Sequence, residues 1–202
     1  MTSMPLYGLV LAGGKSVRMQ QDKGSMDYHG ETQREHVAKL LAPYCEKVFV
    51  SCRTEQAAII EPGLVPLFDT FLDLGPAGGM LTALRAFPNA AWLVAACDLP
   101  YLTNASIEHL IARRNPLKVA TAFHNPASGL PEPLLAIWES KSVHRIFDLL
   151  AEGYDCPRKV LINSDCEILA APFLAALANI NTPAEAIAAR KALSVKPSVK
   201  EV

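Results

Sequence analysis

The residues best suited to chemistry lie in one glycine-rich, basic stretch near the start of the chain. It covers residues 11–23 and reads L-A-G-G-K-S-V-R-M-Q-Q-D-K. Gly13 and Gly14 have no side chains, so a base or ribose can approach the backbone closely there. Arg18 and Lys23 could neutralise a triphosphate, because arginine binds phosphate oxygens in a fork and lysine acts as a point charge. The stretch therefore predicts a phosphate-binding loop, although a solvated turn would have a similar composition.

Two familiar phosphate-binding motifs do not account for this loop. A P-loop requires G-x-x-x-x-G-K-[ST], but Leu9 occupies the position five residues before Gly14 where the first glycine should stand. The G-x-G-x-x-G fingerprint of dinucleotide-binding folds is also absent. The loop therefore indicates a nucleotide site of another kind.

Two aspartates follow apolar runs and are candidate ligands of a nucleotide or its metal ion. Asp98 comes directly after the run Ala91–Cys97, where an ionised carboxylate is costly without a partner. Mg²⁺ is usually held by one or two carboxylates together with phosphate oxygens, which suits a lone aspartate at the end of a strand. Asp69 follows the shorter run Leu64–Phe68. Either residue could instead be a turn residue, since aspartate favours turns.

The elements that would position these groups alternate between strand and helix. Apolar runs predict strands at residues 6–12, 47–52, 64–68, 91–97, 118–123, 134–138 and 166–171. Periodicity and capping signals predict helices at residues 33–44, 76–87, 104–115, 140–152 and 183–193, with a short one starting near 158. This alternation predicts an α/β fold: a three-layer α/β/α sandwich with a mostly parallel, Rossmann-like sheet in which Leu6–Ala12 is a central strand. Such folds bind ligands at the carboxyl edge of the sheet.

Length and composition limit the remaining alternatives. The chain has 202 residues, so we expect a single domain over residues 1–193, followed by a flexible polar tail at 194–202. Its 19 basic and 20 acidic side chains give a net charge of −1, without the basic excess of a nucleic-acid binder. Neither a signal peptide nor a membrane-spanning apolar run is apparent. The five cysteines form no C-x-x-C pair, so we expect reduced thiols in a cytoplasmic protein.

The motifs taken together resemble those of the molybdenum cofactor guanylyltransferase family. In that family L-A-G-G-x-S-x-R-M-G-x-D-K follows the first strand, as residues 11–23 do here. The resemblance continues at Asp69, at G-P-A-G-G-M in residues 75–80, at C-D-L-P in residues 97–100 and at N-I-N-T-P in residues 179–183. Because these motifs occur in the family order over nearly the whole chain, we expect a sheet of the nucleotide-diphospho-sugar transferase type.

The resemblance also implies a reaction. It is the transfer of GMP from GTP to the terminal phosphate of molybdopterin, with Mg²⁺ as cofactor and pyrophosphate as leaving group. The implied nucleotide-binding residues are Leu11, Ala12, Gly13, Gly14, Lys23, Asp69 and Asp98, and the implied catalytic residues are Arg18, Lys23 and Asp98. Asp98 would hold the metal ion, and Asn179 and Asn181 would lie on the molybdopterin side. Other proteins of cofactor biosynthesis or molybdoenzyme maturation could be partners.

The chain departs from the family pattern at several positions. Gln20 stands where the family has glycine, and residues 30–33 read G-E-T-Q in place of G-K-P-L. These departures leave open a non-catalytic nucleotide-binding adaptor. A second alternative is a CTP-dependent cytidylyltransferase acting on the same cofactor, although that branch tends to carry L-A-A-G in the loop. Arg158 and Lys159 could contact an anionic second substrate or be solvated surface charge.

Overall fold

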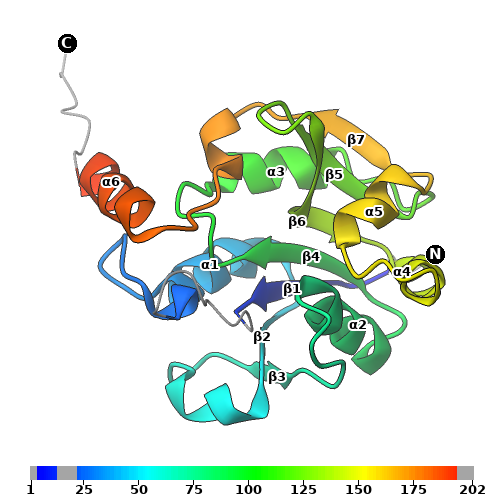
Figure 1. Cartoon of the computed structure of the whole chain (residues 1–202), viewed down its shortest axis with the longest axis horizontal. Helices are drawn as coiled ribbons and strands as arrows, with labels where there is room; N and C mark the ends of the chain where they lie inside the picture. Colours follow the sequence, from blue (N-terminus) through cyan, green and yellow to red (C-terminus); the bar gives the residue numbers. More distant parts are fainter. Residues whose placement is uncertain (1–3, 13–21, 195–202) are drawn as a thin grey trace.

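A mixed sheet of seven strands forms the centre of the fold in the computed structural model, which describes residues 4–12 and 22–194 (Figure 1). The strand order is β3-β2-β1-β4-β6-β5-β7. The strands are β1 (Leu6–Leu11), β2 (Lys47–Cys52), β3 (Pro66–Phe68), β4 (Ala91–Ala96), β5 (Ala120–Asn125), β6 (Leu130–Trp138) and β7 (Glu167–Ala170). The helices are α1 (Gln33–Leu41), α2 (Pro76–Ala86), α3 (Asn104–Ala112), α4 (Ser142–Ala151), α5 (Pro157–Ile162) and α6 (Pro183–Ser194), with 3₁₀ turns η1 (Lys23–Ser25), η2 (Ala42–Tyr44), η3 (Thr54–Ile59) and η4 (Leu174–Leu177).

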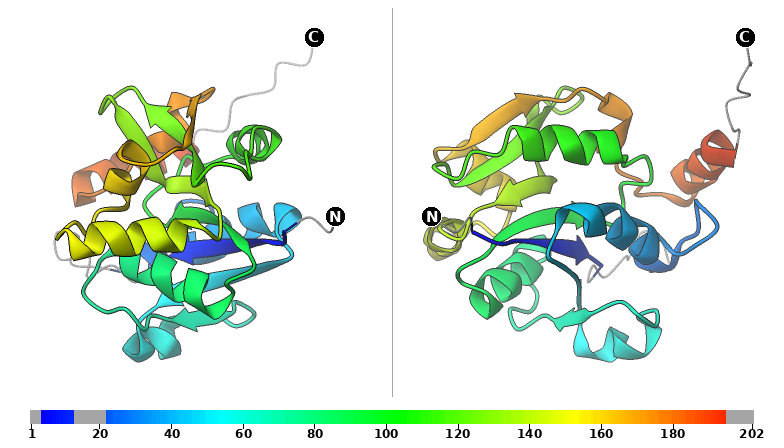
Figure 2. Two further views of the ribbon diagram at one scale, coloured as in Figure 1. Left: turned by 90° about the vertical axis from the view of Figure 1, so that its right-hand side faces the viewer. Right: turned by 180° about the vertical axis from the view of Figure 1, so that it is seen from behind.

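Helices cover both faces of the sheet, so the predicted three-layer α/β/α sandwich is confirmed (Figure 2). On one face, α1 and α3 pack against alternate residues of β1 and β4, as Leu41 and Ile107 do in the first core cluster. On the other face, α2, α4 and α5 pack against the intervening residues, as Met80 and Ile146 do in the second cluster. All six residues of β4 are buried, because this strand lies in the middle of the sheet with helices on both sides.

The pairing of the strands is mostly parallel, as the sequence predicts. β1 lies between β2 and β4 and pairs with both in parallel, which confirms that it is an interior strand. β6 is the exception, since it runs antiparallel to both β4 and β5. The predicted start of this strand at Leu134 is wrong, because pairing with β5 begins at Leu130. Pro131 and Pro133 made the segment look irregular, and the pairing tolerates them beside a register shift between Ala122 and Phe123.

Other predicted boundaries are also corrected. β3 is limited to Pro66–Phe68, β5 begins at Ala120 instead of Lys118, and α3 ends at Ala112 instead of Asn115. β5 begins later because residues 115–118 form a turn, in which Lys118 N donates to Asn115 O. α6 continues to Ser194, one residue into the predicted tail. None of the described helices is long and apolar enough to cross a membrane.

The start of α2 packs unusually close to neighbouring segments because it carries two glycines. A Cβ atom on Gly78 would lie 2.1 Å from the carbonyl oxygen of Phe71, and one on Gly79 would lie 2.3 Å from Ser51 Oγ. Gly75, which caps the helix, has φ of +52°, a backbone conformation that favours glycine. The G-P-A-G-G segment therefore brings α2 against the carboxyl ends of the strands.

Gly78→Ala is expected to destabilise the fold by about 3 kcal/mol, because the added methyl group would meet a backbone carbonyl instead of a side chain that can move. Gly129→Ala is the matched control. A Cβ atom there meets nothing within 4 Å, so only its φ of +69° should cost about 1 kcal/mol. Urea unfolding of both variants measures the difference, and equal losses would contradict the close-packing explanation.

Candidate active site

The candidate site lies at the carboxyl edge of the strands β3, β2, β1 and β4. Ala12, the residue after β1, donates its backbone N–H to Ser51 O at 3.1 Å, and Cys97 N donates to Leu11 O at 3.3 Å. The ends of three neighbouring strands are therefore joined where the glycine-rich stretch begins. The arrowheads of β1 and β4 both point toward the side of the molecule that carries α6 (Figure 1).

Three predicted site residues meet at this edge although they are far apart in the sequence. Lys23 Nζ donates to Asn181 Oδ1 at 2.7 Å and lies 3.3 Å from Asp98 Oδ2, with which it forms an ion pair. The side chains of Lys23 and Asp98 are 23% and 16% exposed, so both remain partly accessible. This contact joins the segment after the glycine-rich stretch, the end of β4 and the segment before α6.

Asp98 lies in a setting that disfavours its charge. Burial raises the pKa of this carboxyl group, and the neighbouring Lys23 ammonium opposes that rise. Asp98 Oδ1 is buried and has no hydrogen-bond partner in the described part of the chain, and the same holds for Asn179 Oδ1. The backbone N–H of Ile180 donates to Asp98 O at 2.8 Å, which holds residues 179–181 beside the aspartate.

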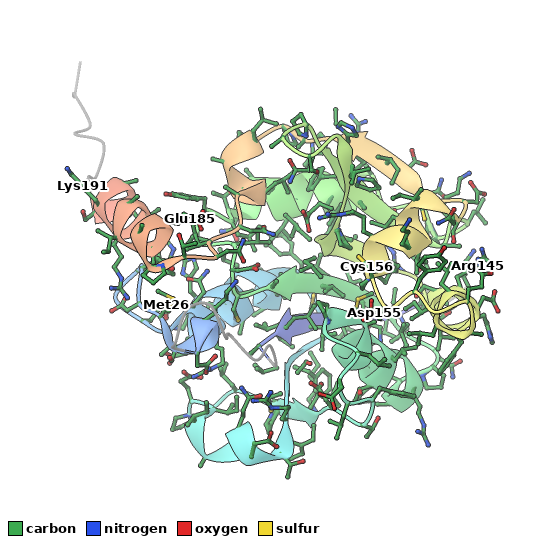
Figure 3. All side chains as sticks on the ribbon, in the orientation of Figure 1. Met26, Arg145, Asp155, Cys156, Glu185 and Lys191 are labelled. Carbon is green, nitrogen blue, oxygen red and sulfur yellow. The ribbon has the colours of Figure 1, made fainter. Side chains whose placement is uncertain are left out.

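Asn181 is fixed by the cap of α6. Glu185 Oε2 accepts hydrogen bonds from the backbone N–H groups of Asn181 at 2.7 Å and Thr182 at 3.0 Å, and these bonds hold the pKa of Glu185 below its usual range. The Thr182–Glu185 capping box predicted from the sequence is therefore present. Met26 belongs to the small core cluster that α6 completes, and Figure 3 shows Met26 and Glu185 at the same end of the molecule.

Asp69 lies at the end of β3 in the same edge. Its side chain accepts a hydrogen bond from Ser51 Oγ at 2.7 Å, and its backbone N–H donates to Cys52 O at 2.9 Å. Burial raises the pKa of Asp69, while the Ser51 hydroxyl and the charge of Arg53 act in the opposite direction. At the end of β2, Ser51-Cys52-Arg53 stands where the family tends to carry an Asn before an Arg. The Ser51 hydroxyl is a local partner of Asp69 that the motif comparison alone does not reveal.

The remaining predicted residues have different outcomes. Leu11 and Ala12 lie at the end of β1, in contact with β2 and β4. Gly13, Gly14 and Arg18 lie outside the described residues, so their predicted roles stay predictions.

Sequence reasoning missed Glu132, which lies at the same edge because β6 runs antiparallel to β4. Its side chain is 1% exposed, and burial raises its pKa. Arg158 Nη2 lies 3.6 Å from Glu132 Oε2, and Arg158 Nε donates to Pro131 O at 3.0 Å. Arg158 is thus tied to β6 instead of being only solvated charge. A single charged residue between two prolines was the only available signal in the sequence.

The described residues offer oxygen ligands suited to Mg²⁺. Asp98 Oδ1 and Asn179 Oδ1 are buried oxygens that have no hydrogen-bond partner among residues 4–12 and 22–194, and hard cations prefer carboxylate and amide oxygens. Within the described part of the chain, no group of three or more His, Cys, Asp or Glu side chains could hold a metal by itself. A cation at Asp98 would therefore take further oxygen ligands from substrate phosphates.

The fold and this edge define a nucleotidyltransferase of the nucleotide-diphospho-sugar transferase fold. The chain belongs to the MobA-like NTP transferase domain family, which matches residues 8–167.

Individual relatives of this chain carry more specific names than the family. A molybdenum cofactor biosynthesis bifunctional protein of Synechocystis sp. is 40% identical over 89% of this chain, which spans 52% of that protein's length. A molybdenum cofactor guanylyltransferase of Pseudomonas putida is 29% identical over 89% of this chain and 94% of that protein. The crystal structure of the molybdopterin-guanine dinucleotide biosynthesis protein A from Archaeoglobus fulgidus has the same fold. It covers 94% of this chain and 100% of that chain, with a TM-score of 0.75 and 23% identity.

Ser51→Ala is expected to move the acid limb of the pH profile of kcat/KM to higher pH. The hydroxyl stabilises the ionised form of Asp69, so its removal should raise the pKa of Asp69 further and delay ionisation as the pH rises. Ser142→Ala is the control, since Ser142 is also buried but its hydroxyl has no hydrogen-bond partner within the described structure. An acid limb that stays in place in Ser51→Ala would show that Asp69 does not act in its ionised form.

Proposed function

We propose that this chain is a molybdenum cofactor guanylyltransferase. It transfers GMP from GTP to the terminal phosphate of molybdopterin, forming molybdopterin guanine dinucleotide and releasing pyrophosphate. The observation that carries the proposal is the contact of Lys23 with Asp98 and Asn181 at the carboxyl edge of the sheet, in a chain of the MobA-like family. The names of the relatives support guanine as the base and molybdopterin as the acceptor.

The acceptor needs little chemical activation from the protein. A terminal phosphate monoester is already ionised at neutral pH, so its oxygen can attack the α-phosphorus of the nucleotide without a strong general base. What the protein must supply is alignment of the two anionic substrates and compensation of the charge that develops on the phosphates. A lysine that is held in place and remains partly exposed serves this purpose.

Lys23 is the described residue best placed for that task. Its ammonium is held in the site between Asp98 and Asn181, and a bound triphosphate can accept hydrogen bonds from the same group. Arg18 is proposed to bind the triphosphate beside it. On the other side of β1, Asp69 is proposed to bind the guanine nucleotide, with Ser51 holding its carboxylate in place.

Mg²⁺ is the proposed cofactor, and Asp98 with Asn179 would hold it together with phosphate oxygens. When bound, the ion acts as a Lewis acid on the phosphates. Asp98 also fixes Lys23, so the same carboxylate sets the position of both positive charges. Asn181, fixed by Glu185, is proposed to lie on the molybdopterin side, and Arg158, which donates to Pro131 O in β6, is proposed to contact an anionic acceptor.

The setting of the reaction is part of the proposal. All five cysteines are free thiols, which suits a cytoplasmic protein. The chain spans about half the length of its Synechocystis relative, so protein partners of this activity are proposals as well. Other proteins of cofactor biosynthesis or molybdoenzyme maturation are the proposed partners.

Asp98→Asn should lower the rate of pyrophosphate release from GTP and molybdopterin by about 100-fold or more, since the amide removes the negative charge that binds Mg²⁺ and holds Lys23. Circular dichroism should show an unchanged fold. Asp165→Asn is the matched control, because Asp165 is 74% exposed and pairs only with Lys118 among the contacts of its carboxylate. Near-normal turnover of Asp98→Asn at saturating Mg²⁺ would remove Asp98 from the mechanism.

GTP is expected to be the preferred donor by about 10-fold or more in kcat/KM over CTP, with each factor of ten equal to about 1.4 kcal/mol of barrier. Side-by-side transfer assays with the four nucleoside triphosphates measure the preference. Higher transfer from CTP would assign the chain to the cytidylyl reaction instead. GTP binding without pyrophosphate release would favour the adaptor alternative.

A further inference from the structure

We infer that Arg34 is a positioning residue for nucleotidyl transfer, which acts by fixing the backbone on both sides of Lys23. The inference rests on the proposed function of Lys23. Arg34 lies in the first turn of α1 and does not belong to any of the motifs that resemble the family. It directly follows residues 30–33, where the chain departs from the family stretch.

The guanidinium of Arg34 is almost completely buried, and each of its three nitrogens has at least one acceptor. The side chain is 2% exposed. Nε and Nη2 donate to the Glu61 carboxylate at 2.8–3.2 Å, Nη2 also donates to Ile59 O at 2.9 Å, and Nη1 pairs with Asp22 Oδ2. Such a group is held in one orientation, because the loss of any partner of a buried charge strongly destabilises the folded state.

Arg34 contacts the residues immediately before and after Lys23 in the sequence. Asp22, the residue before Lys23, pairs with the guanidinium, and its other oxygen accepts the backbone N–H of Gly24 at 3.0 Å. Gly24, the residue after Lys23, packs directly on Arg34, since a Cβ atom there would lie 2.7 Å from both Cγ and Nη1 of the arginine. Lys23 is thus held between two residues that are both fixed by one side chain.

Helix stabilisation does not explain an arginine at this position. Thr32 caps α1 and forms a capping box with Glu35, so Arg34 stands in the first turn. A cation near the amino end of a helix is unfavourable, because the helix dipole presents partial positive charge there. The two carboxylates of Asp22 and Glu61 offset that cost. The arrangement therefore points to a requirement outside the helix, namely the segment that carries Lys23.

The charge network also joins two sides of the site. Glu61 follows η3, which lies between β2 and β3, while Asp22 lies at the end of the glycine-rich stretch. Through Arg34, the segment with Lys23 is anchored to the part of the chain that leads to Asp69. In this assignment Asp22, although part of the D-K signature, is an anchor for Lys23 and not a ligand of the substrate.

A double-mutant cycle tests the inference. Lys23→Met should lower kcat/KM by about 100-fold and Arg34→Met by about 30-fold, with the loss mainly in kcat. The double variant should be no worse than Lys23→Met alone, because both changes remove the same positioned ammonium. Arg34→Lys should recover part of the activity. Losses that multiply in the double variant would overturn the inference.

The matched control is Arg114→Met. Arg114 makes a similar two-bond ion pair with the buried Glu139, at 2.8 and 2.9 Å, but it lies at the opposite, amino edge of the sheet. This variant should lose stability without a change in kcat at temperatures below its unfolding. If Arg34→Met does not fold, Asp22→Asn replaces it. That change leaves the Arg34–Glu61 pair and the acceptor for Gly24 N in place, and it should lower kcat by about 10-fold.

A second measurement is independent of enzyme activity. The rate at which an amine-selective acetylating reagent modifies Lys23 is followed by peptide mass spectrometry in the full chain. The rate should rise several-fold in Arg34→Met and in Asp22→Asn and stay unchanged in Arg114→Met. If wild type shows no nucleotidyl transfer, the proposed function fails, and this rate alone decides the role of Arg34. An unchanged rate in both variants would overturn it.

Discussion

The rest of the site depends on one constraint, a carboxylate just after the carboxyl end of a fully buried strand. β4 delivers Asp98 to the carboxyl edge of the sheet, and burial there raises its pKa. Burial disfavours the charged form, because transfer of an unpaired charge out of water is costly, and the nearby Lys23 ammonium opposes this effect. Lys23 forms an ion pair with Asp98, and among the described residues Asp98 Oδ1 has no hydrogen-bond partner. We propose that this pair also binds the anionic substrates and the metal.

Around this pair the molecule uses a second set of contacts to hold each partner. Asn181 is fixed by the cap of α6, through Glu185. Lys23 is flanked by residues that pack on Arg34 in α1. Two supports of the site thus lie at helix starts. The start of α6 carries the capping box beside Asn181, and the first turn of α1 carries the arginine that contacts the neighbours of Lys23. Helix starts suit this task because their side chains are held near exposed backbone N–H groups.

The departures from the family pattern can be interpreted in the same terms. At the end of β2, Ser51-Cys52-Arg53 stands where the family tends to carry an Asn before an Arg. The Ser51 hydroxyl holds Asp69, and its side chain limits the approach of α2 at Gly79. The stretch before Arg34 differs from the family, yet α1 starts there with a regular capping box. Both departures change which side chains support the site and leave the order of strands and the carboxyl edge intact.

The sequence by itself determined the layers, the order of the main elements and the edge of the sheet at which Asp69 and Asp98 lie. Periodicity and buried runs mark β1 and β4, and loops after parallel strands must share one edge, so Asp69 and Asp98 could be placed together. It could not determine the direction of β6 or its start, because Pro131 and Pro133 obscure the strand pattern and pairing depends on β5. Nor could it show which charges meet. The contacts of Lys23 span 75 and 158 residues, and such separations are closed only by packing of the complete sheet and its helices.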